Sequence, residues 1–386
     1  MTSHPAVRLH SVGLRSFRSY RHLELPLHAG LNVFLGANGA GKTNLLEAVA
    51  YLALGRSPRN ARDADLATDG SAGFEIHASV SDSPPASSGR PSCIAVRYRP
   101  GLGRTVQLDG QVPGPPSSLY GRVLAVFFCP DDLWLLKGPP AGRRQFLDRL
   151  LVQASPLYAD ALNRYRHALA QRNATLQQVR ARRAGRALLA IWEPQLVQYG
   201  AEMLQRRAAA VQGLEAAAAA AYQEVAGADE PLACRYVPGL GAALDPGEPR
   251  AWAVRFQEAL ERQAEADVAV AATTVGPHRD DLHVLISGRS VLRFASQGQQ
   301  RSAALALKFA ERALLRRLTG RLPLLLVDDV CSELDARRRE ALRRLLTEEG
   351  QVFLTTADEA QAAELPDDGR YAVVPGSITA LRPIRP

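Results

Sequence analysis

Apolar residues recur at strand and helix spacing towards both ends of the chain. Residues 31–35 form a short apolar run that predicts a buried strand, and residues 44–54 carry apolar side chains at helical spacing. The other segments whose pattern predicts strands are 7–14, 23–27, 74–80, 93–99, 104–108, 122–128, 281–287, 290–294, 322–327 and 352–355. Residues 81–92 are rich in Pro, Ser and Gly and predict a flexible insertion.

The middle of the chain has a different, helical pattern. Ser155 followed by proline is typical of a helix start, and the helical pattern continues to about Ala184. Two more helices are predicted, one ending near Val225 and one over 250–266, and a further helix runs from Ser296 to Gly320. We therefore predict an α/β head with an inserted helical arm. The expected divisions are 1–130 for the N-terminal half of the head, 131–270 for the arm and 271–386 for the C-terminal half.

A glycine-rich loop joins the strand over 31–35 to the helix that follows it. The loop fits the phosphate-binding pattern of a glycine, four residues and then Gly-Lys-Thr. Its residues are Gly36, Ala37, Asn38, Gly39, Ala40, Gly41, Lys42 and Thr43. Backbone N–H groups of such a loop suit a triphosphate, Lys42 would neutralise the β- and γ-phosphates, and the Thr43 hydroxyl would ligate Mg²⁺. An ordinary glycine turn is disfavoured because both flanking elements fit, so we expect ATP and Mg²⁺ as cofactors.

Two carboxylates follow the apolar run that ends at Val327. Asp328 would hold Mg²⁺ through water, and Asp329 would orient or deprotonate the attacking water as a catalytic group. The alternative is that the two acids merely cap the next turn. A phosphate loop elsewhere in the same chain favours the catalytic interpretation.

Composition and charge narrow the class of partner. The formal net charge is +8 and the pI is about 9.6, which indicates a polyanionic partner, most often nucleic acid. Four scattered cysteines without a Cys-x-x-Cys pair argue against zinc and a disulfide framework and favour a cytoplasmic location. No apolar stretch is long enough for a membrane helix, and the N-terminal residues lack a signal-peptide layout.

Two regions rich in arginine are candidates for contacts with phosphates. Residues 15–21 hold three arginines and two aromatics, and they either clasp an adenine or a phosphate or form a solvated turn. Residues 143–186 hold ten arginines against two acids, a local charge of +8. We predict a DNA contact there, most specifically at Arg180, Arg182 and Arg183, through phosphates and without sequence reading. The alternative is a solvated helix surface.

Two further strings resemble motifs of ABC-type ATPases. Residues 295–299, Ala-Ser-Gln-Gly-Gln, resemble the Leu-Ser-Gly-Gly-Gln signature, and residues 328–335 fit the pattern Asp-Glu-x-x-Ser-x-Leu-Asp with Asp329 in place of Glu. The resemblance implies that the signature meets the nucleotide bound by an opposing subunit, with Ser296 as a catalytic contact. The residues that it assigns to nucleotide contact are Ser296, Gly298, Gln299 and Asp335. A plain helix cap remains the alternative for Ser296 and for Asp335.

The head resembles the SMC-like branch of ABC ATPases, and the whole chain resembles the RecF family of bacterial recombination and repair proteins. The strings that carry this resemblance are 16–20, 36–47, 130–133, 143–148, 276–282, 295–301 and 325–335. It implies an ATP-dependent homodimer that binds DNA at double-stranded and single-stranded junctions or gaps. It also implies weak ATPase activity and work with RecO and RecR in gap repair, replication and the SOS response.

Two departures from the ABC pattern bear on activity. The switch histidine is absent, with Thr355 or Thr356 at its place, and no Q-loop glutamine is evident. Both disfavour a fast hydrolysis cycle. The competing interpretations are a platform that loads partner proteins and uses hydrolysis only to reset, another SMC-like ABC ATPase, and a transporter subunit. The arginine-rich insertion disfavours the transporter.

Overall fold

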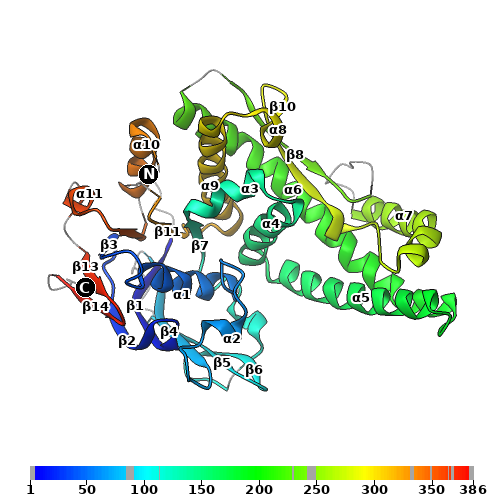
Figure 1. Ribbon diagram of the computed structural model, residues 1–386, viewed down its shortest axis with the longest axis horizontal. Helices are drawn as coiled ribbons and strands as arrows, with labels where there is room; N and C mark the ends of the chain where they lie inside the picture. The colour runs from blue at the N-terminus through cyan, green and yellow to red at the C-terminus, as the bar shows by residue number, and fades with distance from the viewer. Residues whose placement is uncertain are drawn as a thin grey trace. The chain divides into compact units, whose positions relative to one another are not determined.

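The computed structural model describes residues 5–83, 91–112, 114–227, 230–240, 249–330, 334–347, 350–363, 365–366 and 369–381. The chain forms two compact units, labelled by element in Figure 1. The first unit comprises residues 1–132, 224–226 and 311–386, and the second unit comprises 133–223 and 227–310. Most of the expected insertion over 81–92 lies outside the described residues.

A six-stranded sheet brings together segments from both ends of the chain in the first unit. Its strands are, in spatial order, β14 (Ser377–Ala380), β13 (Arg370–Val374), β3 (Leu31–Leu35), β12 (Val352–Thr356), β11 (Leu324–Asp328) and β7 (Ala125–Phe128). All neighbouring pairs are parallel except β13 with β14. Every residue of β7, β11 and β12 is buried, which explains their continuous apolar runs, since a parallel sheet is covered on both faces.

The first unit also contains an antiparallel sheet of five strands. These are β2 (Tyr20–Pro26), β1 (Ala6–Phe17), β4 (Phe74–Ser83), β5 (Ser92–Arg99) and β6 (Gly103–Leu108), in that order. Helix α1 (Lys42–Leu54) contacts β1 of this sheet and β7, β11 and β12 of the other. It therefore lies between the two sheets, and nearly all of its side chains are buried. The unit also contains α2 (Asp63–Leu66), α10 (Ala336–Thr347), α11 (Glu359–Ala363) and the 3₁₀ turns η1 (Pro116–Leu119) and η2 (Pro130–Asp132).

The second unit is mainly helical, with a small sheet. Its helices are α3 (Leu133–Lys137), α4 (Pro140–Ala154), α5 (Pro156–Arg180), α6 (Glu193–Ala226), α7 (Pro249–Val270), α8 (Val291–Phe294) and most of α9 (Gln297–Thr319), with the 3₁₀ turns η3 (Arg186–Ile191) and η4 (Pro277–Arg279). The sheet has the order β10 (Arg289–Ser290), β9 (Asp281–Ile286) and β8 (Leu232–Val237). Ser155 caps α5 as predicted, because its hydroxyl accepts a hydrogen bond from the Tyr158 amide at 3.3 Å.

Three predictions from the pattern differ from the structure. Residues 290–294 are not a strand: β10 ends at Ser290, which then precedes the short helix α8. The strand predicted over 122–128 begins only at Ala125. Residues 271–310, expected with the C-terminal half of the head, pack with the second unit, because β9 pairs along its whole length with β8. Among the described helices, none is long and apolar enough to cross a membrane.

Candidate nucleotide site and signature motif

The glycine loop between β3 and α1 requires glycine at three positions for different reasons. Gly39 and Gly41 have φ values of 81° and 110°, in the left-handed region that L side chains rarely adopt. A Cβ on Gly41 would also lie 2.9 Å from both the Ser19 and the Tyr20 hydroxyl oxygens. A Cβ on Gly36 would lie 2.3 Å from the Val373 carbonyl oxygen of β13. The predicted loop therefore has the tight backbone path that a phosphate cradle needs.

The two functional side chains of the loop point in different directions. The buried Lys42 ammonium donates hydrogen bonds to the carbonyl oxygens of Gly36 at 2.6 Å and Ala37 at 3.1 Å, so it is held within the curve of the loop. Thr43 instead donates from its hydroxyl to Oδ1 of Asp328 at 3.0 Å. Ala37, Asn38 and Gly39 are exposed at the rim of the loop, whereas Ala40 is buried beneath it.

Asp328 connects three elements at one edge of the parallel sheet. It is the last residue of β11, and its Oδ1 accepts hydrogen bonds from Thr43 and, at 2.8 Å, from the Thr355 hydroxyl of β12. A hydroxyl beside a carboxylate provides the hard oxygen ligands that Mg²⁺ prefers. Among the described residues no group of three or more His, Cys, Asp or Glu residues could hold a metal. Mg²⁺ therefore fits here only with water and phosphate oxygens completing its shell.

Asp329 follows in a backbone conformation that is unusual for a non-glycine residue. Its φ is 50°, and its amide donates to the Thr355 carbonyl at 3.3 Å and to the Thr355 hydroxyl at 3.1 Å. Left-handed residues that the surroundings hold in place are concentrated at functional sites. Thr355, which stands near the expected switch histidine, thus bonds both aspartates. The sequence placed Thr355 or Thr356 at the switch position but did not indicate these bonds to the aspartates, because nothing local marks them.

The loop over residues 15–21 contacts both the phosphate loop and helix α1. Nε and Nη2 of Arg18 donate to the carboxylate of Glu47 in α1, at 2.9 Å and 3.0 Å, and the Glu47 side chain is fully buried. The Tyr20 hydroxyl donates to the Gly41 carbonyl at 3.0 Å. Arg18 is therefore committed to Glu47 rather than free to clasp a ligand. A glutamate among the apolar residues of α1 is visible in the sequence, but its partner Arg18 is not.

The signature motif lies in the second unit, at the start of α9. The Ser296 hydroxyl accepts from the Gln299 amide at 3.2 Å, and the Gln299 side-chain oxygen accepts from the Ser296 amide at 2.9 Å. This reciprocal pair is a capping box, so the cap that was the alternative for Ser296 is present. Ser296 is exposed and Gly298 half-buried. A capped, exposed helix start leaves the motif available for an external ligand.

Asp335 caps a helix in the first unit. Its Oδ1 accepts from the Arg338 amide at 3.0 Å at the start of α10, and its other oxygen pairs with the Arg338 guanidinium. The cap that was the alternative for Asp335 is therefore observed. Residues 331–333, which precede it in the same motif, lie outside the described residues.

The arginine-rich run over 143–186 is not uniformly available to a ligand. Arg143 is buried and pairs with Asp281 at 2.6 Å, and Arg172 is buried and pairs with Asp267 at 2.7 Å. The exposed arginines for which the described residues provide no side-chain ion pair are Arg180, Arg182 and Arg183. They lie together at the C-terminal end of α5. The local charge of +8 therefore overstates the free positive surface, and the remaining candidate is this short stretch.

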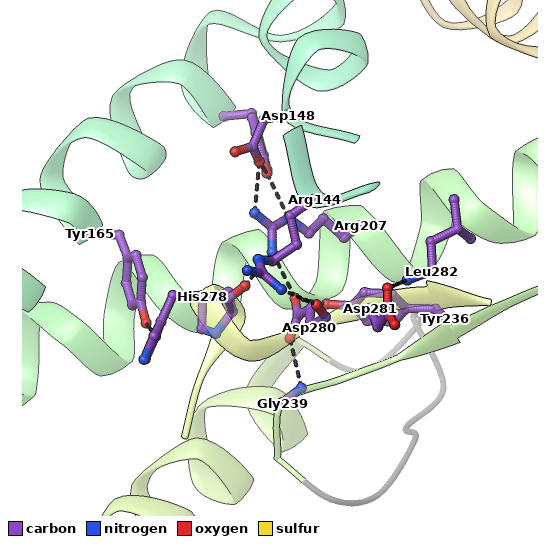
Figure 2. A network of polar contacts seen from close by, with 12 residues as sticks. Arg144, Asp148, Tyr165, Arg207, Tyr236, Gly239, His278, Asp280, Asp281 and Leu282 are labelled. Atoms are coloured by element: carbon purple, nitrogen blue, oxygen red, sulfur yellow. Dashed lines mark hydrogen bonds and ion pairs between the residues drawn. The ribbon is translucent and has the colours of Figure 1, made fainter. Parts of the chain in front are cut away.

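Several of the buried polar groups of the second unit form one network (Figure 2). The Arg207 guanidinium lies between Asp148 at 2.7 Å and Asp280 at 2.8 Å, all three nearly inaccessible to solvent. Arg144 donates to the Asp280 carbonyl at 2.7 Å. The Tyr236 hydroxyl and the Gly239 amide also donate to the Asp280 carboxylate. The network joins the strings 143–148 and 276–282 through Arg144, Asp148 and Asp280.

The split head, its phosphate loop and the separate signature define the class of protein: an ABC-type ATPase head of the SMC-like branch. A solved Smc head domain from Pyrococcus furiosus has the same fold, with a TM-score of 0.54 at 16% identity, covering 97% of this chain and 96% of that chain. A family model described as an AAA domain matches residues 11–104.

The similarity extends over the whole chain for one family within this class. The DNA replication and repair protein RecF of Heliobacterium modesticaldum is 37% identical over 351 residues, which is 91% of this chain and 92% of that protein. A solved structure of the recombination mediator protein RecF-ATPrS in the RecFOR pathway has a TM-score of 0.89 at 28% identity, covering 99% of this chain and 100% of that chain. The chain belongs to the RecF family of DNA replication and repair proteins.

Proposed function

We propose that this chain binds ATP with Mg²⁺ and dimerises by enclosing each nucleotide between the phosphate loop of one copy and the signature of the other. The hydrogen bond between Thr43 and Asp328 carries the proposal. It links the phosphate loop to the end of β11, which is the arrangement that places a metal beside the β- and γ-phosphates. Relatives of the family have been solved as RecF-ATP and RecF-ATPrS, which supports the same ligand here.

Within this proposal each predicted residue has a separate role. Lys42 neutralises phosphate charge, Thr43 and Asp328 hold the metal, and Asp329 orients or deprotonates the attacking water. Mg²⁺ supplies charge neutralisation at the transferred phosphate when it is bound. Ser296 and its neighbours at the start of α9 meet the γ-phosphate of the other copy. Because Thr355 or Thr356 replaces the switch histidine, we expect hydrolysis to be slow.

Two variants with complementary defects test the enclosed-nucleotide geometry. Lys42→Ala removes the phosphate contact in the first unit, and Ser296→Arg places a long side chain on the exposed signature in the second unit. Neither variant alone should dimerise with ATP, because each pair of identical copies has two defective sites. A mixture retains one composite site with an intact loop and an intact signature, and sedimentation should detect partial dimerisation. Dimerisation of Ser296→Arg alone with ATP would refute this geometry.

We propose further that the dimer holds DNA through phosphates, at gaps or junctions between double-stranded and single-stranded segments. The exposed side chains Arg180, Arg182 and Arg183 support this. Each phosphate neutralised adds roughly 0.9 to the slope of log affinity against log salt on duplex DNA. Replacing all three by glutamine should flatten the slope by up to about 2.7 and weaken binding equally on unrelated sequences. An unchanged slope would move the contact to the arginines of the first unit.

The wider role follows the family. RecF structures of the RecFOR pathway suggest RecO and RecR as partner proteins of this chain, in cytoplasmic gap repair, replication and the SOS response. The second candidate, a platform that loads partners and uses ATP only to reset, is favoured by the replacement of the switch histidine. DNA-stimulated ATP turnover distinguishes the two: stimulation supports the DNA-gated enzyme, and equal turnover with and without DNA supports the platform.

A further inference from the structure

The side chain of the signature glutamine, Gln299, is hydrogen-bonded at both its nitrogen and its oxygen. The Gln299 amide nitrogen donates to both carboxylate oxygens of Glu230, at 2.9 Å and 3.2 Å. Its oxygen accepts from the Ser296 amide at 2.9 Å. The Gln299 side chain therefore connects the Ser296 backbone to a carboxylate 69 residues earlier than itself in the chain.

Glu230 determines which way the Gln299 amide faces. An ionised carboxylate only accepts hydrogen bonds, so the NH₂ end of Gln299 has to point towards it. The carbonyl end then faces the Ser296 amide, which needs an acceptor because it precedes the first turn of α9. In the opposite orientation, the NH₂ group would face the Ser296 N–H and two oxygens would face each other at Glu230. The carboxylate thus selects the conformation in which the signature is capped.

Glu230 is itself held by the end of the long helix α6. The Tyr222 hydroxyl, in the last turns of α6, donates to Glu230 Oε2 at 3.3 Å. Helix α6 ends at Ala226, the φ of 64° at Gly227 suits a glycine that follows a helix, and β8 begins at Leu232. Glu230 therefore lies on the connection between α6 and β8, with its carboxylate directed to the signature.

We propose that Glu230 is a positioning residue for the composite ATP site. It acts through Gln299, by fixing the signature start in the conformation that receives the nucleotide of a second copy. The inference rests on the proposed function, since it concerns the same enclosed nucleotide. Glu230 belongs to the second unit and the phosphate loop to the first, so we expect Glu230 to affect dimerisation and not the binding of ATP by a single copy.

The test compares Glu230→Ala, Glu230→Gln and the control Glu258→Ala. Glu258 is an exposed glutamate of α7 in the same unit, and it pairs with Arg262 four residues on. In Glu230→Ala we expect the ATP-dependent dimer to weaken by about tenfold, on the order of 1.4 kcal/mol, with unchanged ATP affinity of the monomer. Glu230→Gln keeps one acceptor for Gln299 and should recover part of the loss. The control should match the wild type.

Three outcomes would overturn the proposal. The first is a Glu230→Ala protein that dimerises like the wild type, and the second is a Glu230→Gln protein that is no better than Glu230→Ala. The third is a loss of dimer accompanied by an equal loss of unfolding free energy in the second unit, which would make the role merely structural. If the wild type does not dimerise with ATP at all, the proposed function itself fails, and that result is distinguishable from the other three.

Discussion

Replacement of Arg207 by methionine should lower the unfolding free energy of the second unit far more than a substitution of an exposed residue. The guanidinium bonds Asp148, Asp280 and the carbonyl of Pro277, the last at 2.6 Å, and its side chain is only 2% exposed. Methionine fills similar space but leaves two buried carboxylates without their shared cation. Breaking a buried ion pair by removing one partner costs about 3–5 kcal/mol, because an uncompensated charge stays buried.

The loss of stability should depend on pH in a way that identifies its cause. In the wild type, burial raises the pKa of Asp148, but Arg207 and the Tyr158 hydroxyl outweigh burial and hold this pKa below its ordinary value. Its stabilising contribution is therefore present above pH ~4 and is lost as pH falls through the lowered pKa. Burial raises the pKa of Asp280 above its ordinary value, because Arg207 offsets burial only in part.

Without Arg207 both carboxyl groups lose this opposing charge, and both folded-state pKa values rise. The folded variant then binds protons that the unfolded chain does not, so its stability increases as pH falls from neutral towards the unfolded pKa of about 4. The difference in unfolding free energy between variant and wild type should therefore shrink between roughly pH 7 and pH 5.

Tryptophan fluorescence during urea denaturation measures this unit selectively. All three tryptophans of the chain, Trp134, Trp192 and Trp252, belong to the second unit. With a urea slope of about 2 kcal/mol per molar, the midpoint should fall by roughly 1.5–2.5 M. The neighbouring Arg206→Met is the matched control. Arg206 is about one-third exposed and pairs with Glu202, so its loss should cost no more than about 1 kcal/mol. Equal midpoints for the two variants, or a difference independent of pH, would refute the reasoning.

The remaining predictions concern the nucleotide site. Asp329→Asn should retain ATP-dependent dimerisation while turnover falls by about a hundredfold or more, since Asp328 still holds the metal; near-normal turnover would exclude Asp329 as the base. Thr355→Val removes the hydroxyl that bonds both aspartates, and titration with Mg²⁺ should show roughly fivefold weaker metal-dependent ATP binding, about 1 kcal/mol, which an unchanged titration would contradict. Gly41→Ala should abolish nucleotide binding in a fluorescence assay, because of its φ of 110° and the 2.9 Å approach to two hydroxyls, whereas Gly142→Ala, with open space around its Cβ, should bind normally.

The sequence predicts those parts of the site whose residues are close together in the chain. The glycine loop, its strand and its helix are contiguous, and Asp328 ends an apolar run, so their chemistry is visible in short windows. The contacts of Thr355, and the pairing of Arg18 with Glu47, join residues distant in sequence. No spacing rule marks them, because tertiary packing alone brings them together.

The arginine-rich run over 143–186 shows that a count of charges along the sequence does not reveal which of them are exposed. Counting charges over 143–186 treats every arginine as exposed, whereas Arg143 and Arg172 face carboxylates from segments more than 90 residues away. Helical spacing distinguishes a buried face from an exposed one for apolar residues. Helical spacing does not identify an arginine that forms a buried ion pair, because arginine also occurs on the exposed face of the same helix. The strand predicted over 290–294 is wrong beyond Ser290 for a related reason, since a short apolar run fits a helical turn as well as a strand.

The order of strands in the parallel sheet has a consequence for biosynthesis. Strand β3, which leads into the glycine loop, pairs with β12 on one side and with β13 on the other. Both neighbours are encoded more than 300 residues after it, between Val352 and Val374. On the ribosome, the loop therefore stays without its flanking strands while the helical segment and α9 are made. A nascent chain halted before Val352 should not be retained on an ATP matrix, however completely its second unit has folded.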